Sequence, residues 1–365
     1  MIVKKQSKGG KHMRKYYIDN IRTVTILLVV LYHVIYMFNS IVTDGVIGPI
    51  AAAPALDAVQ YVLYPWFMMI LFLLSGMCSR YYLEKHTVQE YVRARTRKLL
   101  VPSTIGVLVT GWSLGYMNMR IAHTTALLSE PIPGVIRYLI LCVSGIGVLW
   151  TIQVMWVLSM LLVVLRRLER GRLERLGAKA GMPALLLLGL LVYASAQVLN
   201  TPVIAVYRFG VYGMVFLLGY YVFSQERIIG LLERYAIWLI AGALVAGVVY
   251  VVREFGVNYA TMPHVGSPLA ITYGWLMCLA VLGGMKRFAD RGTLRWLKER
   301  SFGIYVFHYL PLAVCAVLLT NETQLPAVWI YLLTTVAAMG GALLLNAVIS
   351  RIPVLRWCVL GIKKR

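Results

Sequence analysis

The sequence is poor in acidic residues and in cysteine, and both shortages limit the kinds of site that the protein can form. Asp and Glu together number 14 among 365 residues, against 36 Lys and Arg. The five cysteines show no pairing rhythm and no metal-ligand spacing, so they indicate neither a disulfide framework nor a zinc site. No polar linker of domain size and no separate soluble module interrupts the chain. Any chemistry therefore has to take place in its apolar part.

Apolar residues are what the chain has in excess. They make up 60% of the residues and give a mean hydropathy of +0.75, whereas roughly 45–50% is usual in soluble domains. We therefore predict an all-α polytopic membrane protein, because about 20 apolar residues cross a bilayer as a helix. About ten such stretches are present, at 21–41, 60–79, 99–118, 146–165, 182–199, 206–224, 235–252, 268–285, 302–320 and 327–350.

The positions of the basic residues predict the topology. All but four of the Lys and Arg residues fall before the first span or in alternate connections, the exceptions being Arg120, Arg137, Arg208 and Arg253. The positive-inside bias therefore places both termini in the cytoplasm, and it favours contact with anionic membrane lipids over nucleic acid as a partner. We divide the chain into a basic, disordered tail at 1–15, one transmembrane domain at 16–350 and a basic C-terminal tail at 351–365.

Arg22 and His33 share one face of the first span. They are eleven residues apart, which is close to three helical turns, so His33 is expected roughly 16 Å deeper than Arg22. An ionisable side chain at that depth is costly to insert and is a functional-site hypothesis by default. The alternatives are a neutral imidazole that bonds a neighbouring helix and an arginine that snorkels to the surface.

His308 is the second histidine expected inside a span. It follows the boundary residue Arg300 by eight positions, so we expect it about 12 Å into its helix, entering from the same side as His33. If the two helices are neighbours, both imidazoles converge on one polar site. A neutral imidazole suits general-base work on a hydroxyl or covalent acyl relay. The other four histidines fall in tails or loops: His12, His86, His123 and His264.

The stretch from Tyr17 to His33 resembles the opening motif of the acyltransferase-3 family of integral membrane acyltransferases. In that motif an aspartate and an arginine precede an apolar run that ends in histidine, and Asp19, Arg22 and His33 match it in place. Further along, SFGIYVFHYLP resembles the late Ser–Tyr–His motif of the family, with Tyr305 and His308. The resemblance covers nearly the whole chain in the family's order.

Two stretches between these motifs match less specifically. FLLSGMCSRYY, with Ser75, resembles the small-residue end of the second helix, and RARTRKLLVP resembles the basic run before the third. Lys98 stands where the family often has arginine; lysine keeps the charge but loses the bidentate fork. Arg93 and Arg97 are the substitutes that we consider. GVLWTIQ, with Trp150, only loosely resembles the mid-chain tryptophan motif.

The resemblance implies transfer of a short acyl group, acetyl or succinyl, from cytoplasmic acyl-CoA to a hydroxyl of an envelope glycan or a similar acceptor. It implies acyl-CoA as a co-substrate, no tightly bound cofactor, no metal, and a multi-pass location in a bacterial inner membrane. We assign His33 and Arg22 to catalysis. The donor-binding set is Arg93, Arg95, Arg97, Lys98 and Ser75, and the acceptor or cavity set is Asp19, Trp150, Tyr305 and His308.

Other interpretations remain open at this point. Ser75, Tyr305 and Trp150 are also explained by helix packing, and Arg208 is left out of the site because its span shows small residues at packing spacing. A proton-coupled transporter that uses His33 and His308 is the alternative function. The lack of Asp or Glu near any span centre and the absence of obvious broken helix pairs argue against it. A third alternative is a membrane scaffold without catalysis.

Overall fold

The computed structural model describes residues 15–42, 44–199, 207–292 and 295–362, and every regular element in these ranges is helical. The α-helices are α1 (Tyr16–Met37), α2 (Pro54–Leu63), α3 (Phe67–Leu83), α4 (Val88–Arg95), α5 (Val107–Ile121), α6 (Gly134–Ser144), α7 (Trp150–Glu169), α8 (Arg172–Ala178), α9 (Met182–Ala196), α10 (Phe209–Leu218), α11 (Glu226–Arg234), α12 (Ala236–Glu254), α13 (Pro268–Ala289), α14 (Arg295–Phe307), α15 (Tyr309–Glu322), α16 (Ala327–Arg351) and α17 (Pro353–Leu360). Short π-helical turns are η1 (Thr96–Leu100), η2 (Pro102–Gly106) and η5 (Gly219–Phe223), and 3-10 turns are η3 (Thr125–Leu128), η4 (Gly147–Leu149) and η6 (His264–Gly266).

The prediction of an all-helical, multi-span membrane protein is confirmed, with a smaller number of spans. Within the described residues, seven helical stretches are long and apolar enough to cross a membrane. Two bent pairs raise the number to nine: α10–η5 with α11, bent by 98°, and α14 with α15, bent by 56°. The one expected span that is not among these nine is 182–199. It corresponds to α9, whose 15 residues reach about 22 Å, short of the roughly 30 Å hydrocarbon core. The bent pairs also correct the expectation that the helices would be unbroken.

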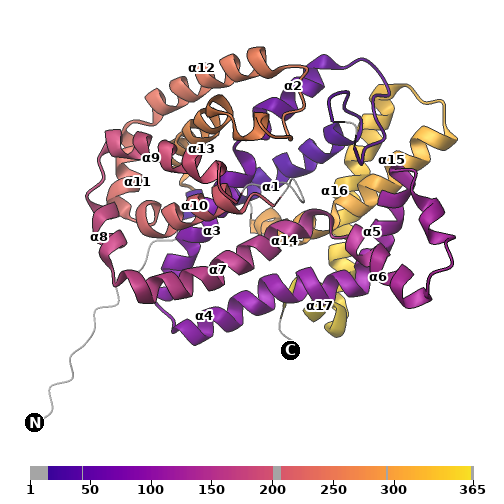
Figure 1. Cartoon of the computed structure of the whole chain (residues 1–365), viewed down its shortest axis with the longest axis horizontal. Helices are drawn as coiled ribbons and strands as arrows, with labels where there is room; N and C mark the ends of the chain where they lie inside the picture. Colours follow the sequence, from indigo (N-terminus) through magenta and orange to yellow (C-terminus); the bar gives the residue numbers. More distant parts are fainter. Residues whose placement is uncertain (1–14, 43, 200–206, 293–294, 363–365) are drawn as a thin grey trace, which may run out of the picture.

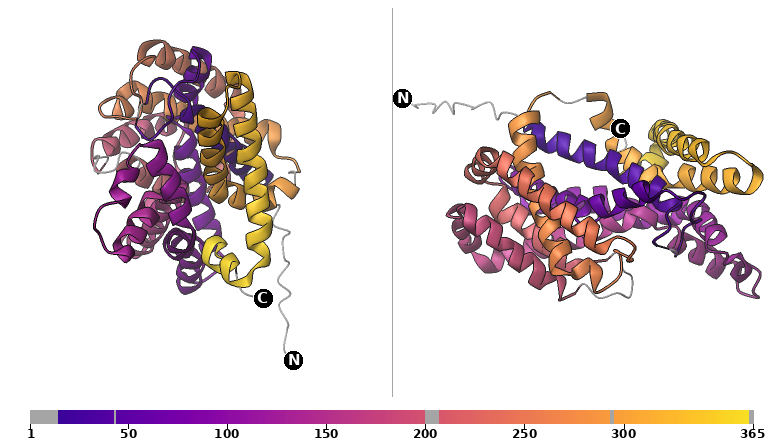
Figure 2. Two further views of the ribbon diagram at one scale, coloured as in Figure 1. Left: turned by 90° about the vertical axis from the view of Figure 1, so that its right-hand side faces the viewer. Right: turned by 90° about the horizontal axis from the view of Figure 1, so that it is seen from above.

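Helix α1 crosses the interior of the bundle, with α12 and α13 on one side of it and α4 and α7 on the other (Figure 1). It contacts α13, α14, α15 and α16 as well as α2 and α3. Both views in Figure 2 place α15 and α16 beside the N-terminal helices, although nearly 300 residues separate them from α1 in sequence. This arrangement brings the two ends of the chain's transmembrane domain together around α1.

Helices α3 and α10 pack side by side in the same direction. The Phe72 ring stacks on the Tyr212 ring at 4.4 Å, and one turn later a Cβ added to Gly76 would lie 1.9 Å from the backbone oxygen of Phe216. The contact is closer than any other residue type permits, because only glycine leaves the backbone uncovered. The small residues of SGMCS therefore position α3 against α10.

Two π-helical turns interrupt the span 88–121 between α4 and α5. Pro102, which supplies no backbone N–H, begins η2, and such turns are frequent at functional sites. Helix α17, in the region expected as a tail, packs here, and a Cβ on Gly106 would lie 2.9 Å from the Cys358 backbone oxygen. The predicted N-terminal tail, residues 1–15, lies outside the described residues except for Lys15.

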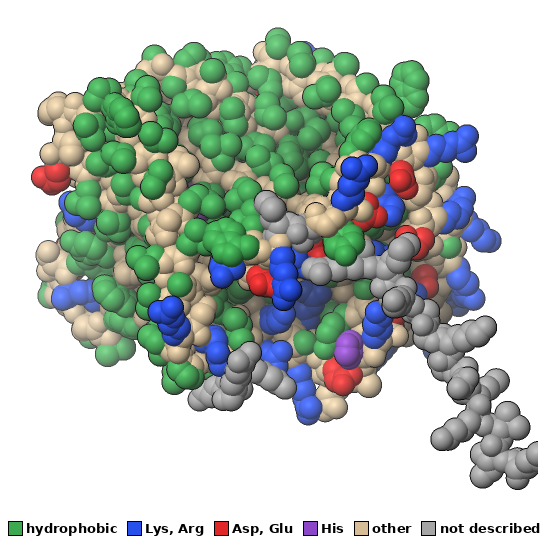
Figure 3. Space-filling model, turned by 180° about the vertical axis from the view of Figure 1, so that it is seen from behind, with side chains coloured by type: hydrophobic (Ala, Val, Ile, Leu, Met, Phe, Trp, Pro, Cys, Tyr) green, Lys and Arg blue, Asp and Glu red, His purple; other side chains and the backbone are tan. Residues whose placement is uncertain are grey.

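Charged side chains gather at one end of the bundle, which we call the basic end and define by Arg22, Arg80, Lys98 and Lys298. Figure 3 shows Lys and Arg side chains crowded, with a few acidic ones, over the lower and right-hand parts of this face, and hydrophobic side chains over the upper part. Ion pairs join helices there; Arg80 Nη2 lies 2.5 Å from Glu174 Oε1. The apolar surface between the ends matches a protein embedded in lipid.

Candidate active site

Two histidines from distant parts of the sequence meet in the bundle. His33 lies in α1, and His308 occupies the break between α14 and α15, where the chain bends. His308 Nε2 lies 3.1 Å from His33 Nδ1, and the ring centroids are 5.1 Å apart. The convergence expected if their helices were neighbours is thus present in the structure.

The backbone acceptors around the pair decide which nitrogens carry protons. His308 Nδ1 faces the carbonyl oxygens of Ile304 and Tyr305, at 3.2 and 2.9 Å. Because a carbonyl oxygen only accepts, this nitrogen carries the proton and Nε2 of a neutral His308 is an acceptor. His33 Nδ1 faces that acceptor and, at 2.8 Å, the Val29 oxygen, so it also carries its proton. The unprotonated nitrogen of His33 is therefore Nε2.

Accessibility differs between the two imidazoles. His308 is fully buried, whereas His33 is only partly buried. The rings of Tyr32 and Tyr309 stand edge-on to the His33 ring, at centroid distances of 5.4 and 5.1 Å. The aromatic walls fix the orientation of His33 while leaving part of it open. Of the pair, His33 is the member that a substrate can reach.

Tyr305 lies beside this pair, its ring 6.3 Å from that of His308, and Trp150 lies close in sequence to Val148, which Tyr305 contacts. Tyr305 is one turn before His308, and its hydroxyl donates to the Val148 oxygen at 2.8 Å. Trp150 begins α7 two residues after Val148, and its ring lies 5.6 Å from Tyr212. The structure therefore brings together three of the four residues that we grouped as the acceptor or cavity set.

Asp19, the fourth member of that set, does not lie with the others. It precedes His33 by 14 residues on the continuous helix α1, which separates them by about 21 Å. Its Oδ2 accepts from Lys298 Nζ at 2.5 Å, and its Oδ1 lies 3.8 Å from Arg22 Nη1. Asp19 thus belongs to the basic end, where it joins α1 to α14. The family motif placed Asp19 correctly on α1, but it did not show that the partner of Asp19 would be Lys298 at the basic end.

Arg22 occupies the same basic end. Its Nη2 donates to Cys78 Sγ on α3 at 3.4 Å, and 40% of its side chain is exposed. The positive charges of Arg22, Arg95 and Arg97 all act on Lys98. Arg22, which we assigned to catalysis, thus lies near the basic run of η1 and the end of α4, about 16 Å along α1 from His33. Arg93 is exposed on α4 and stands apart from the contacts that hold Arg95.

A small polar network holds Arg95. Its Nη2 donates to Ser79 Oγ at 2.7 Å, and the Tyr91 hydroxyl donates to the same oxygen at 2.9 Å. Ser79 Oγ in turn donates to the Ser75 backbone oxygen at 2.7 Å. The Ser75 hydroxyl itself is buried without a hydrogen-bond partner. Sequence reasoning missed Ser79 and Tyr91, whose only signal is their spacing, four and sixteen residues after Ser75.

Sequence reasoning also missed Arg208, which precedes α10. The side chain is 5% exposed, and its guanidinium lies over the rings of Tyr64 and Tyr212, 5.1 and 5.2 Å from their centroids. The signal was present, because an arginine that borders an apolar span merits a functional hypothesis. It was discounted because the same span carries glycines at packing spacing.

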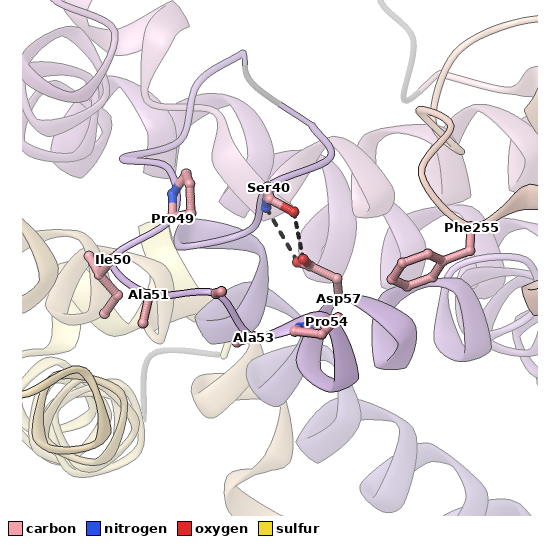
Figure 4. Close-up of a pocket in the computed structure, with 9 residues that line it drawn as sticks. Ser40, Pro49, Ile50, Ala51, Ala53, Pro54, Asp57 and Phe255 are labelled. Atoms are coloured by element: carbon pink, nitrogen blue, oxygen red, sulfur yellow. Dashed lines mark hydrogen bonds between the residues drawn. The ribbon is translucent and has the colours of Figure 1, made fainter.

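A separate pocket opens at the far end of α1 (Figure 4). It has a volume of about 600 Å³ and is lined by the apolar stretch 49–54 together with Ser40, Asp57 and Phe255. Ser40 Oγ donates to the Asp57 carboxylate at 2.6 Å, and Gln60 Nε2 donates to it at 3.5 Å.

A hydrogen-bonded chain runs from this pocket toward the histidine pair and ends at Tyr32. The Tyr259 hydroxyl donates to Gln60 Oε1 at 2.5 Å, and it lies 3.1 Å from the Tyr32 hydroxyl, which is therefore the donor in that contact. Burial raises the pKa of the Tyr259 hydroxyl, so it stays protonated at neutral pH. Tyr32 neighbours His33, so the chain runs from Asp57 to the side of the imidazole.

A metal site is not indicated within the described part of the chain. No group of three or more His, Cys, Asp or Glu side chains there is arranged to hold a metal ion. The arrangement instead offers a partly buried imidazole with an unprotonated nitrogen in the middle of α1 and a group of cations near its N-terminal end.

These features define a polytopic membrane protein with a histidine pair inside its helical bundle. A family model described as an acyltransferase domain, that of the acyltransferase-3 family, matches residues 15–347, nearly the whole chain. The chain belongs to this family and is a membrane acyltransferase. Comparison with curated proteins and with solved structures gives no match.

Proposed function

We propose that the protein moves a short acyl group, acetyl or succinyl, from cytoplasmic acyl-CoA to a hydroxyl of an envelope glycan or similar acceptor, in a bacterial inner membrane. The observation that carries the proposal is the histidine pair, whose hydrogen bonds leave His33 Nε2 unprotonated on a side chain that is only partly buried. An unprotonated imidazole nitrogen is the group that general-base or nucleophilic acyl transfer needs.

In the general-base route, His33 Nε2 takes the proton of the acceptor hydroxyl as its oxygen attacks the thioester carbonyl. The carbon–sulfur bond breaks, the coenzyme leaves as a thiolate, and His33 returns the proton to that sulfur. His33 Nδ1–H points at the Val29 oxygen and at His308 Nε2, two acceptors that stabilise the transient imidazolium. His308 acts as a positioning residue, because its own proton is held by Ile304 and Tyr305.

In the relay route, His33 Nε2 attacks the thioester itself and forms an acyl-imidazole with release of the coenzyme thiolate. The acceptor hydroxyl then attacks that acyl group, and its proton passes to the coenzyme thiolate or to solvent. Both routes use the same nitrogen and the same support from His308. They differ in whether coenzyme A is released before the acceptor is added.

The donor, in this proposal, enters at the basic end. The phosphates of coenzyme A are attracted to Lys98, Arg95 and Arg97, and the slim pantetheine arm passes Arg22 toward His33. A distance of about 16 Å along α1 between Arg22 and His33 suits the length of that arm. The orphaned Ser75 hydroxyl is available to a polar group of the arm.

The acceptor, in this proposal, approaches through the pocket at Asp57. Carboxylate, hydroxyl and aromatic groups together suit a sugar, since Asp57 and Ser40 bond hydroxyls and the face of Phe255 covers a ring. The pocket lies at the opposite end of α1 from the donor site, and its hydrogen-bonded chain ends beside His33. Donor and acceptor would thus reach the same imidazole from opposite sides.

The test is coenzyme A release by the protein in nanodiscs, with acetyl-CoA or succinyl-CoA offered alongside envelope extract of the host. Wild type is compared with His33→Ala and with His123→Asn, a control for loss of a histidine. His123 is exposed and has a positive φ of 54°, a conformation that asparagine tolerates.

We expect sustained, multiple-turnover release that requires the extract, disappears in His33→Ala and is unchanged in His123→Asn. Rapid mixing separates the two routes, because a burst of coenzyme A before the extract is added supports the relay. Full activity in folded His33→Ala would contradict the proposal. Flux of a solute or protons without any acyl-CoA would instead favour the transporter.

A further inference from the structure

Arg208 is a buried cation that has no anionic partner in the described part of the chain. Its side chain is 5% exposed, and its one hydrogen bond to a described residue runs from Nη2 to the Tyr212 hydroxyl at 2.9 Å. Its Nε is buried and makes no hydrogen bond. Among the described residues no carboxylate forms an ion pair with it; the neighbours that interact with its charge are tyrosines. Burying such a charge unpaired is costly, because guanidinium loses its hydration.

The depth of Arg208 in the bundle follows from its position relative to α3, because α3 contacts both α1 and α10. Phe67, early in α3, lies 5.0 Å from the ring of Tyr32, the neighbour of His33, while Cys78, near its end, contacts Arg22. Phe72 lies opposite Tyr212, and the two helices run in the same direction. Arg208, one turn before Tyr212, is therefore level with the beginning of α3.

That level is also the level of His33, and it lies about 15 Å from the end occupied by Arg22. Arg208 is thus separated from the cations that we assign to the phosphates of the donor. The wall between Arg208 and the imidazole is aromatic: the guanidinium lies over Tyr64, and the ring of Tyr64 lies 6.0 Å from that of Tyr32.

The backbone adds to the positive potential at this point. Arg208 is the N-cap residue of α10, so the positive end of the helix dipole lies at its backbone and adds to the charge of its side chain. Helix starts of this kind bind carboxylates and phosphates. The buried guanidinium, whose Nε has no hydrogen-bond partner and which pairs with no described carboxylate, is the separate observation that makes this helix start a candidate site.

We propose that Arg208 forms a subsite for an anionic group, a carboxylate or a phosphate, that one of the two substrates carries at the depth of His33. The assignment of the anion to a substrate rests on the proposed function. The anion has two possible sources, a carboxylate at the end of the acyl chain, as in succinyl, or an acidic group of the acceptor. In either case Arg208 selects a charged substrate over its neutral counterpart.

Thermal unfolding of the purified protein in detergent micelles tests the subsite without relying on turnover. Three pairs of probes are compared at equal ionic strength: inorganic phosphate with chloride, succinyl-CoA with acetyl-CoA, and glucuronate with glucose. The second pair isolates a carboxylate on the acyl group, and the third isolates one on an acceptor sugar. We expect at least one charged probe to raise the midpoint by about 2–4 °C more than its counterpart.

The matched variants are Arg208→Gln and Arg253→Gln, which remove the same charge from a buried and an exposed arginine. The difference between charged and neutral probes should vanish in Arg208→Gln and persist in Arg253→Gln. If Arg208→Gln does not fold, Arg208→Lys replaces it, and the difference should shrink because lysine lacks the planar fork. Equal midpoints for every pair in wild type, or a difference that survives in Arg208→Gln, would overturn the subsite.

His33→Ala separates this proposal from the proposed function. The variant lacks the transfer nitrogen but keeps Arg208, so it should show the wild-type preference for the charged probe. An anion-dependent shift in a wild-type protein that never releases coenzyme A would refute acyl-CoA chemistry while upholding the subsite. Release of coenzyme A with no anion preference would do the reverse.

Discussion

The bundle holds its cations in two contrasting ways. At the basic end, Arg22, Arg95 and Lys98 lie close together, partly exposed, and two of them have polar partners in Cys78 and Ser79. At the level of the histidines, Arg208 is alone, buried and covered by tyrosine rings. Several exposed charges attract a multiply charged ligand from a distance but are screened by salt. A single buried charge acts only at contact, and acts strongly because water is excluded.

This contrast predicts a division of labour between the two levels. Changes at the histidine level should lower turnover or alter the choice of substrate, whereas changes at the basic end should weaken donor binding and leave turnover intact. Each of the following experiments either sharpens that division or breaks it.

The largest effect is expected for His33→Gln. The variant keeps polarity but removes the basic nitrogen, so kcat should fall by about 10²–10⁴, while KM for acyl-CoA should stay within a factor of about three. Steady-state coenzyme A release in nanodiscs measures both constants. A large rise in KM with unchanged kcat would assign His33 to substrate binding, and turnover and donor binding would then not be separated between the histidine level and the basic end.

A change in the contact between α3 and α10 should affect both the histidine site and the basic end, because α3 extends from one to the other. In Gly76→Ala the new Cβ would lie 1.9 Å from the backbone of Phe216, so α3 must move away from α10. We expect a loss of about 1–3 kcal/mol in stability, seen as a lower unfolding midpoint, with both kcat and KM impaired.

The matched control for this change is Gly340→Ala on α16. No atom lies within 4 Å of a Cβ placed there, so the substitution should be neutral or slightly stabilising through helix propensity. If Gly76→Ala matched Gly340→Ala, the two levels would not depend on the α3–α10 contact.

His308→Phe should reduce kcat by about 10–100-fold and leave KM for the donor unchanged. The variant removes the acceptor for His33 Nδ1–H, and small errors in the position of a catalytic group cost about this much. His308→Gln provides the rescue, because its side-chain oxygen accepts a hydrogen bond in place of Nε2 and should restore part of kcat. Equal loss in both variants would make His308 a packing residue only.

The sequence predicted the helical class, the family and the depth of single residues along their own helices. Periodicity and the 3.6-residue turn place Arg22 and His33 on α1 at two levels, and the structure keeps α1 continuous between them. What the sequence lacked was information about neighbours. The meeting of His33 with His308 depends on the bend between α14 and α15. Pro311 favours a bend at this point, because it cannot donate to the Phe307 carbonyl, but no local pattern shows which helix lies opposite it.

Arg208 and Asp19 show the same lack of information about neighbouring helices, since one was left out of the site and the other was grouped with the wrong residues. Arg208 was discounted because its flanking glycines predict packing, and packing is what buries it. Asp19 was grouped with the acceptor residues by motif, yet its partner is Lys298 at the basic end. Burial and pairing are properties of several helices at once, so they could not be derived from one stretch of sequence.

The smallest effect is expected for Lys98→Gln. Lys98 is exposed, so removal of its charge should raise KM for acyl-CoA by only about two- to five-fold, in line with the 0.2–1 kcal/mol of an exposed charge pair. Its kcat should not change, and the rise in KM should shrink as salt is added, because screening weakens the same attraction in wild type. Arg295→Gln is the matched control, since it removes one charge from an exposed residue paired with Glu299. A salt-independent loss, or a fall in kcat, would place Lys98 in contact with the reacting group and merge the two levels into one site.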